Sequence, residues 1–289
     1  FKGNYSVEFR AFDDGVAYRF ITSQKGDVEV MNEEFAINFP SDYLLHLQQP
    51  GGFHTAYEEP YTHVQSNAWK PEERIAVLPV LIDTQKDYKI LISESDLADY
   101  PCMFLKGTGT NGAISVFPKA PLAFAENSDR SVKITQEADY IAKTKGTRNY
   151  PWRYFVISKN DKQLIENTMT YKLAEKNQLQ DVSWIKPVKY IGVWWEMITG
   201  KSDWAYTRDV PSVQLGVTDY ARCRPSGRHG ANNENVKRYI DFAAAHGFDQ
   251  LLVEGWNVGW EDWFGHTKDY VFDFVTPYPD FDIAALNEY

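Results

Sequence analysis

The fold is decided by a stretch that opens with Trp184-Ile185-Lys186-Pro187-Val188-Lys189-Tyr190-Ile191-Gly192-Val193-Trp194-Trp195-Glu196 and closes with Leu251-Leu252-Val253-Glu254-Gly255-Trp256-Asn257. Val188 to Val193 is a short apolar run after a proline, which predicts a buried strand, and Gln250 to Val253 predicts a second one. Between them, the segment 232–246 has apolar residues at helical spacing, asparagines to cap its start and a glycine just past its end. The order strand, helix, strand indicates a parallel βαβ unit.

Both predicted strands end in tryptophans beside a carboxylate. Trp194-Trp195-Glu196 follows the first strand, and Glu254-Gly255-Trp256 follows the second. The carboxyl ends of the strands form the active face of a βα-barrel. Aromatic rings offer flat apolar faces to the C–H surfaces of a sugar, and carboxylates bind its hydroxyl groups. We therefore predict that Trp195, Glu254 and Trp256 contact a carbohydrate. Packing at the barrel mouth is the competing interpretation for Trp195.

The composition limits the classes of partner. The chain has 289 residues and a formal net charge of -10, which argues against nucleic acid or an anionic membrane surface as its main partner. No apolar run reaches the length of a membrane span. Aromatic residues make up 15% of the chain, which fits a carbohydrate-handling protein and equally fits a β-rich core. The two cysteines, Cys102 and Cys223, are too few for a disulfide scaffold.

Residues 1–183 have the pattern of a β domain. Alternating apolar residues from Tyr5 to Ala11, the turn Asp13-Asp14-Gly15 and the run Val16 to Ile21 predict a hairpin. A second antiparallel pair is predicted from the apolar runs Ile75–Ile82 and Tyr88–Ile92, which a polar turn joins. Further short strands are predicted at 34–39, 103–105, 113–117 and 152–157, a short helix at 161–167 and a polar linker at 170–181. Many short strands favour a sandwich of antiparallel sheets.

Residues 184–289 have the pattern of the first βα units of a barrel. They are too few for a complete (β/α)8 TIM-type barrel, which takes about 250 residues. We therefore expect the chain to be part of a longer protein, with the remainder of its barrel missing from this sequence. The expected domains are 1–183, a β-sandwich that starts inside the domain, and 184–289, the truncated barrel.

Long segments of the chain resemble glycoside hydrolase family 97. The resemblance rests on the runs Trp184–Lys201, Trp204–Thr207, Asn235–Asp249, Val253–Asn257, Gly259–Gly265 and Asp273–Asp282. The N-terminal half matches more loosely, through Phe9–Gly15 and Glu94–Tyr100. The resemblance implies an N-terminal β-super-sandwich followed by a catalytic (β/α)8 barrel, a β + α/β fold class.

The resemblance also implies an activity and a cofactor. Members of the family hydrolyse α-glycosidic bonds of oligosaccharides, mostly in the bacterial periplasm, and an α-glucosidase is the expected activity here. A Ca²⁺ ion in their active site is held largely by glutamates, one of which comes from the N-terminal domain and matches Glu94. The acid and base carboxylates lie on later barrel strands. We therefore expect no catalytic residue in this chain, a site-shaping role for Glu254 and no activity of the chain alone.

A second interpretation belongs to another class of protein. A carbohydrate-binding or purely structural β-sandwich without catalysis fits residues 1–183. It fits the stretch from Trp184 to Trp263 poorly, because a binding module does not need barrel strands. The sequence leaves open which sugar and linkage are preferred and whether the mechanism is inverting or retaining.

Overall fold

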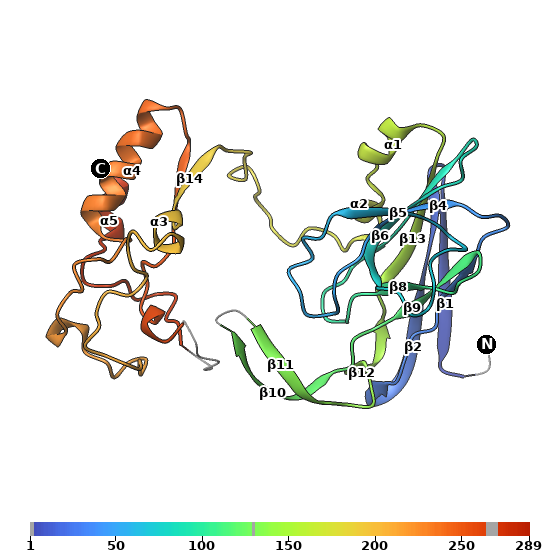
Figure 1. The fold of residues 1–289 in the computed structure, drawn as a ribbon, viewed down its shortest axis with the longest axis horizontal. Coiled ribbons are helices and arrows are strands. Elements are labelled where there is room, and N and C mark those ends of the chain that lie inside the picture. The colour runs from blue at the N-terminus through green and yellow to red at the C-terminus, as the bar shows by residue number, and fades with distance from the viewer. Residues whose placement is uncertain (1–2, 129–130, 264–270) are drawn as a thin grey trace. The chain divides into compact units, whose positions relative to one another are not determined.

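The computed structural model describes residues 3–128, 131–263 and 271–289 (Figure 1). The chain divides into two compact units, Phe1–Ala123 with Thr135–Gln178, and Phe124–Ile134 with Leu179–Tyr289. The expected domain boundary after residue 183 stays a prediction.

Most of the first unit is one antiparallel sheet. Its strand order is β1-β2-β13-β7-β6-β8-β9-β3, with β12 paired to β2 and the hairpin β4–β5 paired to β6. The eleven strands of this sheet, among the described residues, are β1 (Tyr5–Phe12), β2 (Gly15–Val30), β3 (Ala36–Asn38), β4 (Leu44–Gln48), β5 (Tyr61–Gln65), β6 (Ala76–Asp83), β7 (Lys89–Ser95), β8 (Phe104–Gly107), β9 (Gly112–Val116), β12 (Ala142–Asn149) and β13 (Trp152–Ser158). A separate hairpin consists of β10 (Pro121–Ser128) and β11 (Ser131–Glu137).

The long strand β2 curls the sheet. Residues Tyr18 to Gly15 pair with β13, whereas residues Ile21 to Val30 pair with β12. Because β1 pairs with Gly15 to Thr22 along the opposite edge of β2, β12 and β13 follow one another along one edge of β2. The blue strands of Figure 1 show this long ribbon beside β13. The sheet therefore folds around a core formed by alternate inward-facing residues such as Leu45, Leu47 and Ile82.

Two short helices cover the far side of β13. They are α1 (Asp161–Ile165) and α2 (Met169–Leu173). The predicted helix at 161–167 is confirmed, but the predicted linker at 170–181 is wrong in its first turns. Met169 and Leu173 are one helical turn apart, and both are buried beside Trp152. The sequence did not indicate this helix, because most residues around the apolar pair are polar.

The second unit contains the predicted βα pattern. Its elements are β14 (Tyr190–Val193), α3 (Trp195–Ile198), the 3-10 helix η1 (Tyr220–Arg222), α4 (Asn233–Ala245), β15 (Gln250–Val253), the 3-10 helix η2 (Trp260–Asp262) and α5 (Ile283–Glu288). The two strands pair in parallel, with Tyr190 opposite Gln250 and Val193 opposite Val253. Figure 1 shows α4 running back beside β14. The predicted strand–helix–strand unit is therefore confirmed. However, the first strand begins at Tyr190, not at Val188, and neither strand is fully buried, since Tyr190 is 58% and Leu252 is 42% exposed.

The ends of α4 follow the predicted capping. Asn232 Oδ1 accepts a hydrogen bond of 2.9 Å from the backbone N–H of Asn235. Gly247 has a φ of 69°, the left-handed conformation that commonly ends a helix. On the buried face, Val236 belongs to the same core cluster as Val193 of β14. Local sequence signals thus fix where this helix starts and stops.

Two further expectations apply to the whole chain, one about membrane spans and one about the state of its two cysteines. Among the described residues, no helix combines the length and apolar character that crossing a membrane requires. Cys102 and Cys223 are both half-buried and unbridged.

Candidate functional site

Glu94, the predicted calcium ligand, lies in β7 and belongs to a buried ionic cluster of the first unit. Its side chain is 10% exposed, and the Arg153 side chain that contacts it is 1% exposed. The Glu94 carboxylate is therefore buried and paired, and does not stand alone in solvent. The reason is its neighbour on β13, since Arg153 stands directly opposite Glu94 in the register of the two strands.

Arg153 joins two carboxylates. Its Nε and Nη2 atoms donate to the two oxygens of Glu33 at 2.8 and 3.0 Å, a bidentate pair. Its remaining Nη1 donates to Glu94 Oε2. The backbone N–H of Met103 also points at the Glu94 carboxylate, 3.2 Å from Oε2 and 3.3 Å from Oε1. One guanidinium therefore faces two carboxylates.

The cluster of Glu33, Glu94 and Arg153 contains two carboxylates and one guanidinium. With both carboxylates ionised, it has one more negative than positive charge. Burial raises the pKa of Glu94, even though Arg153 and the Met103 N–H act to lower it. Burial, together with the charge of Glu33, also raises the pKa of Tyr18 to about 12. The interior of the first unit thus opposes a second carboxylate charge, and a cation near Glu94 would relieve that opposition.

The described residues do not by themselves form a calcium site. They contain no group of three or more His, Cys, Asp or Glu side chains that could hold a metal ion. Calcium takes about six to eight oxygen ligands, whereas Glu33 is already paired with Arg153 through both of its oxygens. A role for Glu94 as one ligand among several stays a prediction.

The three residues predicted to bind substrate have different surroundings in the structure. Trp195 is 60% exposed on α3 and lies edge-on to Trp194. Trp256 packs against Phe281 within the core of the second unit, with ring centroids 5.8 Å apart. Glu254 follows β15, and its backbone N–H donates to the Val193 carbonyl at 3.1 Å. Their role in binding substrate stays a prediction.

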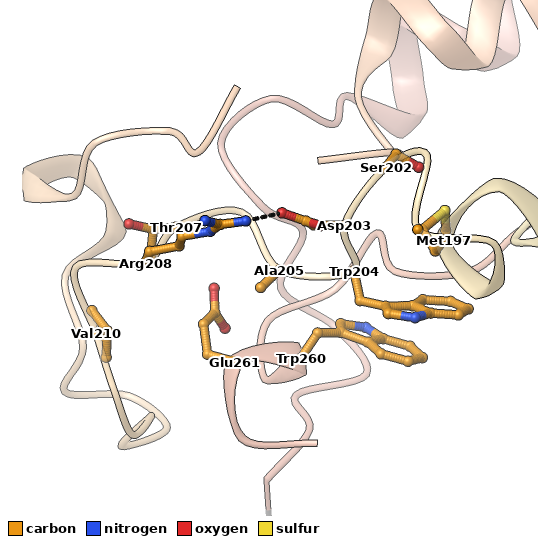
Figure 2. Close-up of a pocket in the computed structure, with 11 residues that line it drawn as sticks. Met197, Ser202, Asp203, Trp204, Ala205, Thr207, Arg208, Val210, Trp260 and Glu261 are labelled. Carbon is orange, nitrogen blue, oxygen red and sulfur yellow. Dashed lines mark hydrogen bonds and ion pairs between the residues drawn. The ribbon is translucent and has the colours of Figure 1, made fainter. Parts of the chain in front are cut away.

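A pocket of about 410 Å³ lies elsewhere in the second unit (Figure 2). It is formed by the loop that follows α3 and by η2. Its lining residues are Met197, Gly200, Ser202, Asp203, Trp204, Ala205, Thr207, Arg208, Val210, Trp260 and Glu261. None of the three predicted substrate residues belongs to this set. The pocket combines aromatic and acidic side chains, as the sequence pattern predicted at the strand ends, and adds hydroxyl groups that the pattern did not predict.

Tryptophan rings form one wall of the pocket. Trp204 and Trp260 stack with centroids 4.7 Å apart and an angle of 11° between their planes, and Trp263 meets Trp204 edge-on at 5.2 Å. Figure 2 shows the two stacked rings on the side of the pocket opposite Val210. Such contacts hold large rings in fixed positions.

Glu261 is held by two tyrosines. The hydroxyls of Tyr220 and Tyr278 donate to Glu261 Oε2 at 2.9 and 2.6 Å. Burial, and after it the nearby Glu261 charge, raises the pKa of both phenols, so they remain donors throughout the physiological pH range. Across the pocket, Asp203 Oδ2 accepts from Arg208 at 2.8 Å, as the dashed line in Figure 2 marks.

His229 links the loops behind this pocket. Its Nδ1 lies 2.9 Å from Asp280 Oδ2, and its Nε2 lies 2.8 Å from the Gly255 carbonyl oxygen. The imidazole is 5% exposed and meets the ring of Tyr278 edge-on. Both ring nitrogens lie within hydrogen-bonding distance of oxygen atoms. His229 is therefore a structural connection between the end of β15 and the chain before α5.

Sequence reasoning missed Ser202, Trp204 and Glu261 as site residues. A signal was present, because Trp260-Glu261-Asp262-Trp263 sets carboxylates beside tryptophans shortly after a strand, as the chosen motifs do. The pocket depends on contacts between this segment and residues about fifty positions earlier, and the spacing of residues along the chain does not reveal those contacts.

Two family models match the chain. Residues 1–176 match the family described as "Glycosyl-hydrolase 97 N-terminal". Residues 194–289 match the family described as "Glycoside hydrolase 97". The two matches fall on the antiparallel sheet and on the βα elements, respectively.

Relatives and solved structures agree with these matches. The chain is 32% identical over 272 residues to a retaining alpha-galactosidase of Bacteroides thetaiotaomicron, covering 89% of this chain and 38% of that protein. It is 24% identical to a probable retaining alpha-galactosidase of Streptomyces bingchenggensis, covering 96% of this chain and 36% of that protein. A family 97 enzyme of Pseudoalteromonas sp. strain K8, solved in complex with acarbose, is similar at 31% identity and a TM-score of 0.68. That match covers 99% of this chain and 38% of the solved chain.

The chain therefore spans little more than a third of the length of these relatives. Its curled antiparallel sheet and its parallel βαβ unit correspond to the expected super-sandwich and to the start of the expected barrel. With the first match alone extending over more than half of its residues, the chain belongs to glycoside hydrolase family 97.

Proposed function

We propose that the full-length protein hydrolyses α-glycosidic bonds of oligosaccharides. The observation that carries the proposal is the family membership of both units. The names of the relatives support it, since one is described as a retaining alpha-galactosidase, another as a probable retaining alpha-galactosidase, and one solved family 97 enzyme is in complex with panose. In this proposal, the acid and base carboxylates lie outside the present sequence, as the resemblance implies.

The preferred sugar has two candidates. We propose α-glucosides first, on the resemblance described above. The alpha-galactosidase of Bacteroides thetaiotaomicron, at 32% identity, favours α-galactosides as the alternative. Measuring kcat/KM of the full-length protein on p-nitrophenyl α-D-glucopyranoside and p-nitrophenyl α-D-galactopyranoside decides between them. Turnover of neither aryl glycoside, nor of any α-linked oligosaccharide, contradicts the proposed function and favours a non-catalytic carbohydrate-binding protein.

We also propose a calcium requirement, with Glu94 as one ligand. The support is electrostatic. The cluster of Glu33, Arg153 and Glu94 carries one more negative than positive charge inside the first unit, and burial opposes ionisation of Glu94. Bound calcium would supply positive charge that orients a substrate oxygen. Loss of activity in EDTA and its recovery with calcium test this requirement.

A periplasmic location completes the proposal and rests on the resemblance alone. Fractionation of cells that produce the full-length protein tests it, and recovery with the cytoplasmic fraction contradicts it.

A further inference from the structure

Two histidines face one another across the hairpin of β4 and β5. His46 stands directly opposite His63 in the register of the two antiparallel strands, and their Nδ1 atoms lie 2.8 Å apart. The ring centroids are 4.7 Å apart, with an angle of 75° between the ring planes. At that distance one Nδ1 carries a hydrogen and the other accepts it. The pair therefore holds a single proton between two nitrogen atoms of the kind that most often bind metal ions in proteins.

The pair lies on the solvent-facing side of this part of the sheet. Leu45 and Leu47, the neighbours of His46 on β4, are 1% and 0% exposed and belong to the core. Because side chains alternate along a strand, His46 points to the opposite face. The ring of His63 is exposed, and that of His46 is half-buried. A dissolved ion therefore reaches the two imidazoles without any rearrangement of the core.

The spacing of the two nitrogen atoms is close to the spacing that a metal ion requires. Zinc binds imidazole nitrogen at about 2.0–2.1 Å, so two ligands in a tetrahedral arrangement lie roughly 3.3–3.4 Å apart. The Nδ1 atoms have to separate by only about half an ångström to reach that spacing. Because His63 is exposed, its ring can make this movement while the backbone pairing of β4 and β5 stays intact.

The nearby charges leave the imidazoles neutral and able to bind a metal ion. Burial, and after it the neighbouring His63, lowers the pKa of His46, while Asp83 acts to raise it and Lys89 to lower it. The Asp83 carboxylate already accepts from the Gln85 backbone N–H at 2.7 Å, and it lies 3.8 Å from Lys89 Nζ. The two histidines therefore supply two ligands, and the remaining ligands come from water.

We propose that His46 and His63 bind one divalent transition-metal ion, of the type of Zn²⁺ or Ni²⁺, through their Nδ1 atoms. Imidazole suits these ions, whereas calcium takes oxygen ligands. The site does not involve Glu94 and does not depend on the proposed hydrolysis. Among the described strands, β5 pairs with β4 alone. A bound ion therefore ties this strand to the sheet and closes the loop 49–60 that joins the two strands.

His46→Asn and His63→Asn in the full-length protein test the proposal. Asparagine places an amide near the position of Nδ1, so a hydrogen bond across the hairpin remains possible, but the imidazole ligand is lost. His54→Asn is the matched control, because His54 is an exposed histidine in the loop between the same two strands. Isothermal titration calorimetry with zinc chloride, in an excess of calcium chloride, gives the zinc Kd. Thermal unfolding with zinc and with EDTA gives the stabilisation by zinc.

We expect either substitution to raise the zinc Kd of one equivalent by at least about tenfold, since the loss of an outer partner of a metal ligand already costs about that much. Zinc should raise the Tm of the wild type and of His54→Asn, and raise the Tm of the two hairpin variants less. Zinc affinity that is unchanged in both hairpin variants overturns the proposal, as does a wild type that binds no zinc. Because the ring of His63 is exposed, His63→Asn decides the question if His46→Asn does not fold.

Discussion

Glu33→Gln and Glu94→Gln should affect the stability of the first unit very differently, although both remove one carboxylate from the same arginine. Glu33 accepts two hydrogen bonds from Arg153, and the two side chains are 6% and 1% exposed. Arg153 stays paired with Glu94 in Glu33→Gln, but the amide nitrogen of glutamine faces one of the two donors, and a buried donor without a partner costs about 1–3 kcal/mol. For a unit of this size that corresponds to a decrease in Tm of roughly 2–12 °C.

The substitution of Glu94 removes the surplus charge and leaves the bidentate pair intact. Glutamine retains an oxygen that accepts from Arg153, and the remaining Glu33–Arg153 pair is neutral. Because burial raises the pKa of Glu94, the folded chain is more stable with this carboxyl uncharged. We therefore expect Glu94→Gln to change the free energy of unfolding at neutral pH by less than about 1 kcal/mol, and towards greater stability.

The difference in stability between the wild type and Glu94→Gln should depend on pH in a definite direction. Below the unfolded-state pKa, near 4.5, Glu94 is protonated in both states and contributes no difference. As the pH rises above that value, the unfolded chain ionises first, so the wild type loses stability relative to Glu94→Gln. The stability curves of the two proteins should therefore converge in acid and separate towards neutral pH.

The assay is urea unfolding of the 289-residue chain followed by circular dichroism, with EDTA present so that no divalent cation contributes. Glu29→Gln is the matched control, because Glu29 lies on β2 with a side chain that is 49% exposed. It should stay within about 0.5 kcal/mol of wild type. If Glu94→Gln destabilises the chain as much as Glu33→Gln does, the two carboxylates contribute equally to stability through Arg153. The surplus charge then does not determine the effect of Glu94.

Three further predictions concern calcium, activity and acid stability. Glu94→Gln in the full-length protein should weaken calcium binding measured by calorimetry, because charge count tunes such sites; unchanged affinity would show that Glu94 is not a ligand. The purified 289-residue chain should not hydrolyse α-glycosides, and turnover above a contaminant control would show that a carboxylate such as Glu254 acts as a catalyst. Burial and the neighbouring His63 lower the pKa of His46, so the unfolded chain binds this proton more readily and stability should fall as the pH drops below about 6.5. His46→Gln should flatten that part of the stability curve, and an equally steep curve would refute the assignment.

Helices and strands were predicted most accurately from the sequence where the burial of apolar residues alone determines the structure. β15 and α4 were located from apolar spacing and caps, because both bury one face in the core of the second unit. β12, with the sequence Ala-Lys-Thr-Lys-Gly-Thr-Arg-Asn, was missed. Most of its side chains are polar, and its place is set by backbone pairing with β2 more than a hundred residues earlier. No local pattern reports such a pairing.

The candidate sites were less predictable for the same reason. Glu94 was singled out by resemblance, but its partner Arg153 is 59 positions away and Glu33 is 120 positions from that arginine. The pocket likewise joins Trp204 to Trp260. Aromatic and acidic residues at the strand ends indicated the right kind of site, whereas only the fold determines which of these residues face one another.

The buried carboxylates bear on the rival interpretation of a purely structural protein. A second carboxylate beside Arg153 lowers the stability of the unit that contains it. A neutral replacement at this position is a simple substitution, and a fold under selection for stability alone has no reason to retain the charge. A protein that binds a cation beside Glu94 does have one, because the cation supplies positive charge to the second carboxylate. The stability gained and the calcium affinity lost in Glu94→Gln should therefore appear in the same protein.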